Sequence, residues 1–240
     1  MTRHIVALSG GKDSAAMAIL LSQSIPNLEL AFCDTGRELP EVYSYVAQVG
    51  AVIGKPVRAI QYCGRDFDWY LREFKHYLPD SRNRWCTKHL KIVPFERYLG
   101  KQEATVYIGI RADEDRAGNY GLRRNVEYAY PLHDQGIDRQ GVVSILEAHT
   151  LPLPDFYRWR STGGCWCCPF QRKSDWAGLR LFHPDLFSKA AEDEQKSIEA
   201  TGRRFGWLGN GKPLTRLEAA WQPPLTDAED VDGRCLICAK

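Results

Sequence analysis

Residues 9–14 read SGGKDS and combine the groups that phosphate binding needs. Gly10 and Gly11 allow a left-handed backbone and let a ligand approach the main chain without a Cβ in the way. Lys12 adds a mobile positive charge, and the two serines add hydroxyl donors. Asp13 would repel a phosphate directly, so its expected role is to order the loop or to hold Mg²⁺. The candidate phosphate-binding residues are Ser9, Gly10, Gly11, Lys12, Asp13 and Ser14.

The segments on either side of this loop position it. Ile5–Leu8 is an apolar run typical of a buried strand, and Ala15–Leu21 is rich in helix-forming residues. The loop amides and the helix N-terminus would converge on one point, which favours an anion. The glycine spacing fits neither the Walker pattern nor the dinucleotide fingerprint. We expect an exposed loop that binds phosphate by another known pattern.

Composition excludes few classes of protein. The 240 residues are 44% hydrophobic and 26% charged, as in ordinary soluble globular proteins. The net charge of +2 does not decide whether nucleic acid is a partner. No apolar run reaches membrane-spanning length, so we expect a cytoplasmic protein without membrane association. In that reducing compartment the eight cysteines are not expected to form disulfides and need another role.

Strands and helices alternate over the first half of the chain, which predicts an α/β fold with a doubly wound, parallel, five-stranded sheet. The predicted strands are Ile5–Leu8, Leu28–Cys33, Val57–Tyr62, Ala104–Ile110 and Glu127–Leu132. The predicted helices are Ala15–Ser24, Pro40–Gly54, Phe67–His76, Leu90–Leu99, Val142–Ala148, Ser174–Leu181 and Pro184–Thr201. We expect a nucleotide-binding domain at residues 1–132 and a helical, irregular subdomain with cysteines at residues 133–240.

Two further motifs follow predicted strands, at the sheet edge where ligands bind in such folds. In FCDTGRELPEVY (32–43), Asp34 and Thr35 could bind an adenine or ribose, and Gly36 turns the chain. The same residues could simply cap the next helix. In GIRADEDRAG (109–118), the residues of interest are Gly109 and Arg111, and the alternative is a salt-bridged turn.

Together these motifs resemble a known family. SGGKDS resembles the PP-loop of the ATP pyrophosphatase superfamily, the adenine nucleotide α-hydrolases, whose fold is Rossmann-like. FCDTGRELPEVY and RWCTKHLKIVP (84–94) resemble the phosphoadenosine phosphosulfate reductase branch. GGCWCCPFQRKSDW (163–176) resembles members related to the DNA phosphorothioation protein. The resemblance implies ATP and Mg²⁺ as ligands, Lys12 and Asp13 as catalytic residues, and Arg111 as a contact to phosphate or sulfate.

The cysteines suggest a metal site. Cys165 and Cys168 are spaced C-x₂-C, as are Cys235 and Cys238, and Cys86 is a fifth candidate ligand. Such spacing suits zinc or an iron–sulfur cluster. The resemblance favours a 4Fe–4S cluster over zinc, because related branch members hold one. Cys167 would be an extra thiol beside the ligand pair, and we expect Cys33 and Cys63 to be small buried hydrophobes.

Three functions are consistent with these features. The first is an ATP-dependent sulfurtransferase that adenylates an acceptor and inserts sulfur with the help of the cluster. The second is a sulfonucleotide reductase, from which the chain departs because Cys86 stands alone and the reductase tail Glu-Cys-Gly-x-His is absent. The third is an ATP-binding accessory subunit without turnover.

Partners follow from the first of these functions. A sulfur donor such as a cysteine desulfurase is expected, and a homodimer is possible. The acceptor could be tRNA, a DNA backbone, a nucleotide or a small metabolite. Basic and aromatic residues alternate in RNRW (82–85) and FYRWR (156–160). These segments could contact nucleic acid, or they could be core aromatics beside arginines whose charged ends reach solvent.

Overall fold

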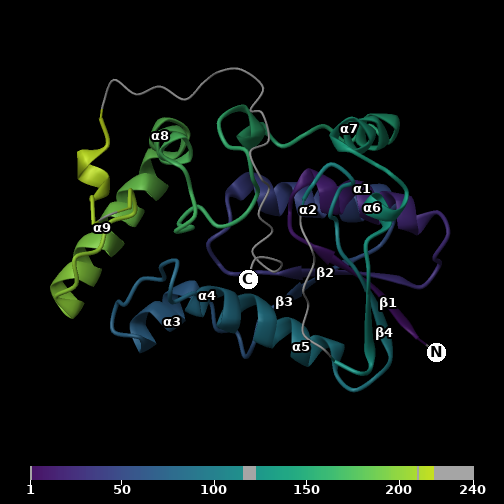
Figure 1. Cartoon of the computed structure of the whole chain (residues 1–240), viewed down its shortest axis with the longest axis horizontal. Coiled ribbons are helices and arrows are strands. Elements are labelled where there is room, and N and C mark those ends of the chain that lie inside the picture. The colour runs from purple at the N-terminus through teal and green to yellow at the C-terminus, as the bar shows by residue number, and fades with distance from the viewer. Residues whose placement is uncertain (1, 116–122, 210, 219–240) are drawn as a thin grey trace.

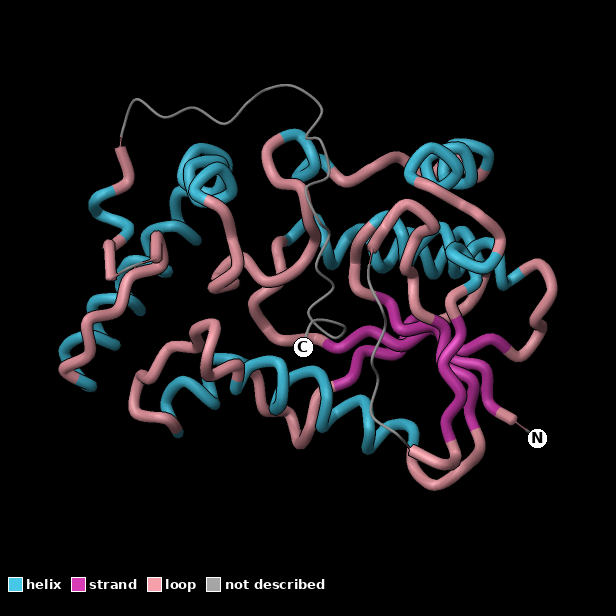
Figure 2. Tube along the Cα trace, viewed as in Figure 1, coloured by secondary structure: helices cyan, strands magenta, loops and turns pink. Residues whose placement is uncertain are grey.

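The computed structural model describes residues 2–115, 123–209 and 211–218. In these residues a five-stranded sheet is parallel throughout, with the strand order β3-β2-β1-β4-β5 (Figure 2, magenta). Its strands are β1 (Arg3–Leu8), β2 (Leu28–Cys33), β3 (Val57–Ile60), β4 (Ala104–Tyr107) and β5 (Val126–Ala129). The predicted α/β class and the five-stranded parallel sheet are confirmed. β3 and β4 end earlier than predicted, so Gly109 and Arg111 lie in the loop beyond β4.

Helices cover both faces of the sheet because its strands are apolar on both sides. On β1, Val6 belongs to the cluster that packs against α1 and α2, whereas Ile5 belongs to the cluster that includes Phe95 of α5. Figure 1 shows α1 and α2 on one side of the sheet and α5 on the other. The helices are α1 (Lys12–Ser22), α2 (Pro40–Ile53), α5 (Val93–Leu99) and α7 (Arg139–Ala148), which packs against α1.

The segment between β3 and α5 differs from the predicted helix at residues 90–99. After α3 (Phe67–Glu73), a one-turn helix α4 (Trp85–Thr87) leads into a π-helical turn (Lys88–Ile92) and then α5. Pro94 has no N–H, so it cannot donate the α-helical hydrogen bond to the carbonyl four residues earlier. The wider π turn ends directly before this interruption.

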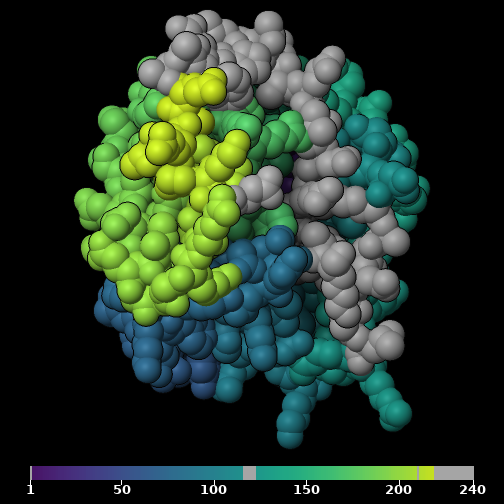
Figure 3. Space-filling view, turned by 60° about the vertical axis from the view of Figure 1, so that its left-hand side comes forward, coloured from purple at the N-terminus to yellow at the C-terminus, as the bar shows by residue number. Residues whose placement is uncertain are grey.

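The described residues after β5 form helices and irregular segments. The C-terminal pair α8 and α9 pack on each other, and α9 lies beside α3 (Figure 1; Figure 3, yellow-green above blue). The elements here are α6 (Pro131–Asp134), a 3₁₀ turn (Asp155–Arg158), α8 (Lys173–Phe182), α9 (Pro184–Thr201) and a second 3₁₀ turn (Leu214–Arg216). No helix in the described residues is long and apolar enough to cross a membrane. The domain division at residue 132 stays a prediction.

Candidate functional site

The SGGKDS loop connects the end of β1 to the start of α1, as predicted. Gly10 has φ of +78°, and a Cβ there would lie 2.5 Å from Cγ1 of Val42 on α2. Both the backbone conformation and the packing of α2 therefore require glycine. The hydroxyls of Ser9 and Ser14 are 3.0 Å apart and close the loop, and Ser14 also donates to the carbonyl of Gly11.

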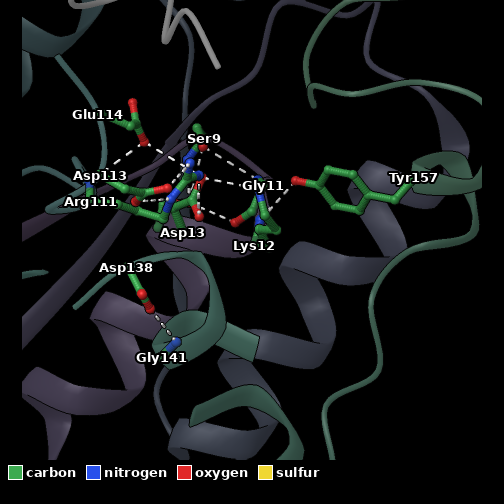
Figure 4. Close-up of polar contacts among 11 residues, drawn as sticks. Ser9, Gly11, Lys12, Asp13, Arg111, Asp113, Glu114, Asp138, Gly141 and Tyr157 are labelled. Carbon is green, nitrogen blue, oxygen red and sulfur yellow. Dashed lines mark hydrogen bonds and ion pairs between the residues drawn. The ribbon is translucent and has the colours of Figure 1, made fainter. Parts of the chain in front are cut away.

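Lys12 is more enclosed than its loop position suggested. Only 4% of its surface is exposed, so the expectation of an exposed lysine is wrong. Its ammonium lies 3.5 Å from a carboxylate oxygen of Asp13 and 5.2 Å from the ring centroid of Tyr157. Tyr157 comes from the 3₁₀ turn at residues 155–158, and its hydroxyl accepts a hydrogen bond from the Lys12 backbone N–H (Figure 4). This neighbour was not predicted, because FYRWR had been interpreted as an acceptor contact or a core segment.

The loop after β4 packs directly on the SGGKDS loop. A Cβ on Gly109 would lie 2.9 Å from the backbone nitrogen of Ser14, so only glycine permits this approach. The buried guanidinium of Arg111 lies among three carboxylates, those of Asp13 (3.2 Å), Asp113 (2.8 Å) and Glu114 (3.4 Å) (Figure 4). Its hydrogen bonds hold the pKa of Asp113 below its usual range. Arg111 therefore orients Asp13 beside Lys12.

Neighbouring residues of the motif after β2 contact two different parts of the structure. Asp34 accepts hydrogen bonds from the backbone N–H of Gly36 (2.8 Å) and the hydroxyl of Tyr43 (2.7 Å). It lies at the end of a groove of about 600 Å³ between α2 and β3. Thr35 instead contacts Sγ of Cys165 at 3.2 Å. Asp34 is thus placed for a ligand in the groove, whereas Thr35 belongs to the surroundings of the cysteines.

Four cysteines line one enclosed cavity of about 20 Å³. Its apolar wall includes Phe67 and Phe170, and the four thiols are those of Cys86, Cys165, Cys167 and Cys168. The structure therefore brings together three of the predicted metal ligands and also Cys167. Cys235 and Cys238 lie outside the described residues. Cys33 is buried as expected, but Cys63 is exposed, which corrects that expectation.

The environment of the cavity thiols raises their pKa values and so disfavours the thiolate form. Burial raises the pKa of Cys86 to about 11 and that of Cys167 to about 12, the latter against the opposing charge of Arg37. Burial and the nearby Glu38 carboxylate raise the pKa of Cys165 well above its ordinary value. The Cys165 thiol donates to Oε1 of Glu38 at 3.3 Å, and Oε2 of Glu38 is buried without a hydrogen-bond partner. Glu38 is thus placed to take the proton that Cys165 would lose on binding a metal.

The donor set fits a thiolate-bound metal or cluster, since soft sulfur ligands select zinc and iron–sulfur centres. In the structure, however, the thiols are not arranged around a common metal position. Within the described residues, no three His, Cys, Asp or Glu side chains are placed to hold one ion. The cavity has about the size of one water molecule. A 4Fe–4S cluster would therefore require the thiols to turn inward and the loop at 163–170 to move outward.

The SGGKDS loop lies close to the loop at 163–170, which is here called the cysteine loop. A Cβ on Gly163 would lie 3.5 Å from the carbonyl oxygen of Gly10 and from Cα of Gly11. Two residues later, Cys165 forms an isolated antiparallel bridge with Glu38, just beyond β2. The predicted nucleotide-binding and sulfur-bearing residues thus share one edge of the sheet.

Comparisons with known proteins agree with this architecture. Residues 3–170 match the family model described as phosphoadenosine phosphosulfate reductase domain. Over 70% of this chain and 83% of the other, the fold matches phosphoadenylyl-sulfate reductase from Candida auris, with a TM-score of 0.56 and 18% identity. An uncharacterized protein of Methanocaldococcus jannaschii is 26% identical over 76% of this chain and 45% of its own length.

A tRNA-specific 2-thiouridylase of Limosilactobacillus fermentum is also similar. It is 33% identical over 51% of this chain and 37% of its own length. The chain thus spans about half, or less, of the length of these curated relatives.

Proposed function

Since the chain belongs to the phosphoadenosine phosphosulfate reductase domain family, within the adenine nucleotide α-hydrolase superfamily, we propose that it is an ATP-dependent sulfurtransferase. The observation that supports this most directly is the contact between the SGGKDS loop and the loop that bears the cysteines. An adenylated intermediate formed at the first loop would lie beside the sulfur chemistry of the second. A protein that only bound ATP would not need four thiols at that position.

In the proposed first step, ATP binds with its triphosphate at residues 9–14 and its adenine in the groove beside Asp34. An acceptor oxygen attacks the α-phosphorus, and the bond to the β-phosphate breaks, so that pyrophosphate leaves with Mg²⁺. Lys12 and the amides at the start of α1 stabilise the negative charge that develops on the phosphates. Asp13, held by Arg111, is positioned to bind the Mg²⁺.

In the proposed second step, a thiol reduces the persulfide of a donor such as a cysteine desulfurase, which releases hydrosulfide and leaves a disulfide. The hydrosulfide attacks the adenylated atom, a new bond to sulfur forms, and the bond to the AMP oxygen breaks so that AMP leaves. Cys86, Cys165 and Cys168 would hold a 4Fe–4S cluster or zinc, with a tail cysteine as a further candidate. A bound cluster would supply an iron at which sulfide can be held. The contribution of Glu38 is to accept the proton of the Cys165 thiol.

The second candidate is a sulfonucleotide reductase, which the description of the matched family favours. In that reaction a thiolate attacks the sulfur of an adenylyl sulfate. Cys86 stands alone where that family carries paired cysteines, and this departure speaks against the reductase. Incubation with adenylyl sulfate and thioredoxin separates the two functions, because only the reductase forms sulfite.

The candidate acceptors of the sulfur are tRNA, DNA, a nucleotide and a small metabolite. Similarity to a tRNA thiouridylase favours tRNA, and the resemblance to the phosphorothioation protein favours DNA. Mass spectrometry of nucleic acids and metabolites from cells with and without the gene would reveal a sulfur-for-oxygen exchange.

The adenylation step has its own test. Lys12→Ala should abolish pyrophosphate release, whereas Lys101→Ala, at an exposed lysine, should leave it unchanged. Because Lys12 is buried, thermal unfolding must show that the variant is folded. Release at the normal rate from a folded Lys12→Ala protein would refute the phosphate-loop assignment.

A further inference from the structure

A further pocket lies between the end of α3 and α4, and α4 also lines the cysteine cavity. We propose that it binds one nucleotide unit of a nucleic-acid acceptor, with its phosphate on the lysines and its base on the aromatic rings. The pocket has a volume of about 600 Å³, and its wall includes Phe74, Lys75, Tyr77, Arg84, Trp85 and Lys88. The inference rests on the proposed sulfurtransferase function and names the class of its acceptor.

The charge of this segment favours a phosphate. Residues 72–91 contain six lysines and arginines but only two acids, Glu73 and Asp80. Asp80 is already paired with Arg203 at 2.6 Å. The net charge of these twenty residues is therefore +4, whereas that of the whole chain is +2. Lys75 and Lys88 are exposed at the pocket and are placed to neutralise phosphates.

The rings at the pocket favour a base rather than an acidic peptide. Phe74 is only partly buried, and its centroid lies 5.2 Å from that of Trp85 and 5.6 Å from that of His89. His89 also stacks on Tyr70. Burial and the charge of Lys88 lower the pKa of His89, which favours the neutral ring. Aromatic faces beside cations are typical of single-strand binding sites.

The position of the pocket connects it to the sulfur chemistry. α4 is the shared wall, because Trp85 lines the pocket while Cys86 and Thr87 line the cysteine cavity. The Arg84 guanidinium lies 5.1 Å from the ring centroid of Phe170, which also lines that cavity. A nucleotide held here would place the neighbouring part of its strand at the edge of the cysteine loop.

The backbone beside the pocket adopts the left-handed conformation at two successive residues. Lys75 and His76 have φ of +51° and +60°, a conformation that residues other than glycine rarely adopt. Two hydrogen bonds to the last turn of α3 hold them, from Lys75 N–H to the carbonyl of Arg72 and from His76 N–H to that of Leu71. Such strain is concentrated at functional sites.

The test uses short single-stranded RNA and DNA oligonucleotides of one sequence, labelled with fluorescein, and measures anisotropy over a range of salt concentrations. Each lost phosphate contact should lower the slope of log K against log salt by about 0.7 for single strands. Because the two lysines share the one phosphate of the bound unit, Lys75→Ala/Lys88→Ala should reduce the slope by about 0.7. The control variant, Lys101→Ala/Lys173→Ala, removes the same charge from exposed sites elsewhere and should keep the original slope.

A second variant tests the base contact. Phe74→Leu removes the ring and keeps much of the apolar volume, so binding should weaken on the order of tenfold at constant salt with an unchanged slope. If this variant unfolds, the lysine variants still decide the question, because those side chains are exposed. Unlabelled AMP and UMP serve as competitors. If AMP or UMP displaces the labelled oligonucleotide completely, the pocket binds a free nucleotide. If only unlabelled oligonucleotides displace it, the pocket binds a nucleotide within a strand.

Failure of this proposal is distinguishable from failure of the proposed function. Oligonucleotide binding is measured without ATP, and pyrophosphate release reports the first step separately. An unchanged slope and affinity for Lys75→Ala/Lys88→Ala would overturn the pocket assignment even if ATP is consumed. Binding of a labelled polyglutamate peptide that these substitutions abolish, without any oligonucleotide binding, would also overturn it and identify an acidic protein partner.

Discussion

The hydroxyl of Tyr157 accepts a hydrogen bond of 3.0 Å from the backbone N–H of Lys12, at the first residue of α1. The amides at a helix N-terminus have no partner within the helix and are the groups that bind phosphate. The Tyr157 hydroxyl therefore lies where a phosphate oxygen of ATP would bind (Figure 4).

Removing this hydroxyl should strengthen ATP binding. Tyr157→Phe keeps the ring beside the Lys12 ammonium but frees the amide, so ATP no longer has to displace a hydrogen bond. A net hydrogen-bond contribution of about 0.5–1.5 kcal/mol corresponds to a Kd about two- to tenfold lower. Isothermal titration calorimetry measures this, with Tyr98→Phe at the opposite end of the sheet as the control. Weaker ATP binding would show that the hydroxyl contacts the nucleotide.

Arg37 should be essential for the stability of the region around the cysteines. Its guanidinium is 2% exposed, lies between the rings of Phe67 and Trp166, and pairs with Asp68 and the buried Asp193. Arg37→Ala leaves the Asp193 carboxylate buried without its cation, which should cost about 3–5 kcal/mol of unfolding free energy. Urea denaturation measures this loss.

Arg158 provides the control for Arg37. It is 79% exposed and pairs with Asp155 at 3.5 Å. Because exposed ion pairs contribute little, Arg158→Ala should change the unfolding free energy by at most about 1 kcal/mol. Equal effects of the two substitutions would contradict the role assigned to Arg37.

Much of the fold could be predicted from local patterns. β2 and α9 have the predicted bounds, because each is a continuous segment of one periodicity with clear ends. The region from α4 to α5 was predicted less well. There α4 begins directly after an arginine-rich loop. A π turn then precedes Pro94, and a hydrophobic pattern with a period of 3.6 residues does not indicate such a turn.

The candidate site was predicted in its residue types rather than in its contacts. Each strand-end motif was correctly placed at one edge of the sheet, because parallel strands all end there. The contact between Lys12 and Tyr157 joins residues 145 positions apart, so no local pattern encodes it. The same reason explains why the sequence does not predict the burial of Lys12.

Acid should weaken the contribution of Glu29 to stability. Arg3 donates to both its carboxylate oxygens, and this lowers the pKa of Glu29 below its ordinary 4.5. The folded protein then binds fewer protons than the unfolded chain, so the contribution is complete above pH 4.5 and is lost as pH falls through the folded pKa. The stability difference between wild type and Glu29→Gln should therefore be largest at neutral pH and shrink below pH 4.5.

Chemical denaturation in a series of buffers tests this dependence. Glu103→Gln, at an exposed glutamate, is the control and should show no such trend. A difference between wild type and Glu29→Gln that stays constant from neutral to acidic pH would exclude linkage through this carboxylate.

The metal ligands can be assigned by cysteine substitution. Protein reconstituted anaerobically with iron and sulfide should contain about four irons per chain and absorb visible light. Cys86→Ser, Cys165→Ser and Cys168→Ser should each lose this iron, because their thiols line the cavity that would enclose it. Truncation before Cys235 should reduce sulfur transfer more than iron content.

Two cysteines serve as controls for that series. Cys167 lies in the same loop, but its thiol interacts with Arg37, so Cys167→Ser should keep its iron. Cys63 is exposed and does not line the cavity, so Cys63→Ser should retain both iron and activity. Because the cavity now holds no more than a water-sized volume, iron uptake should also increase exchange of backbone amides at 163–170. Binding of one zinc per chain without iron uptake would show that the site holds a single metal ion and not a cluster. The thiols could bind one ion with less movement of the loop.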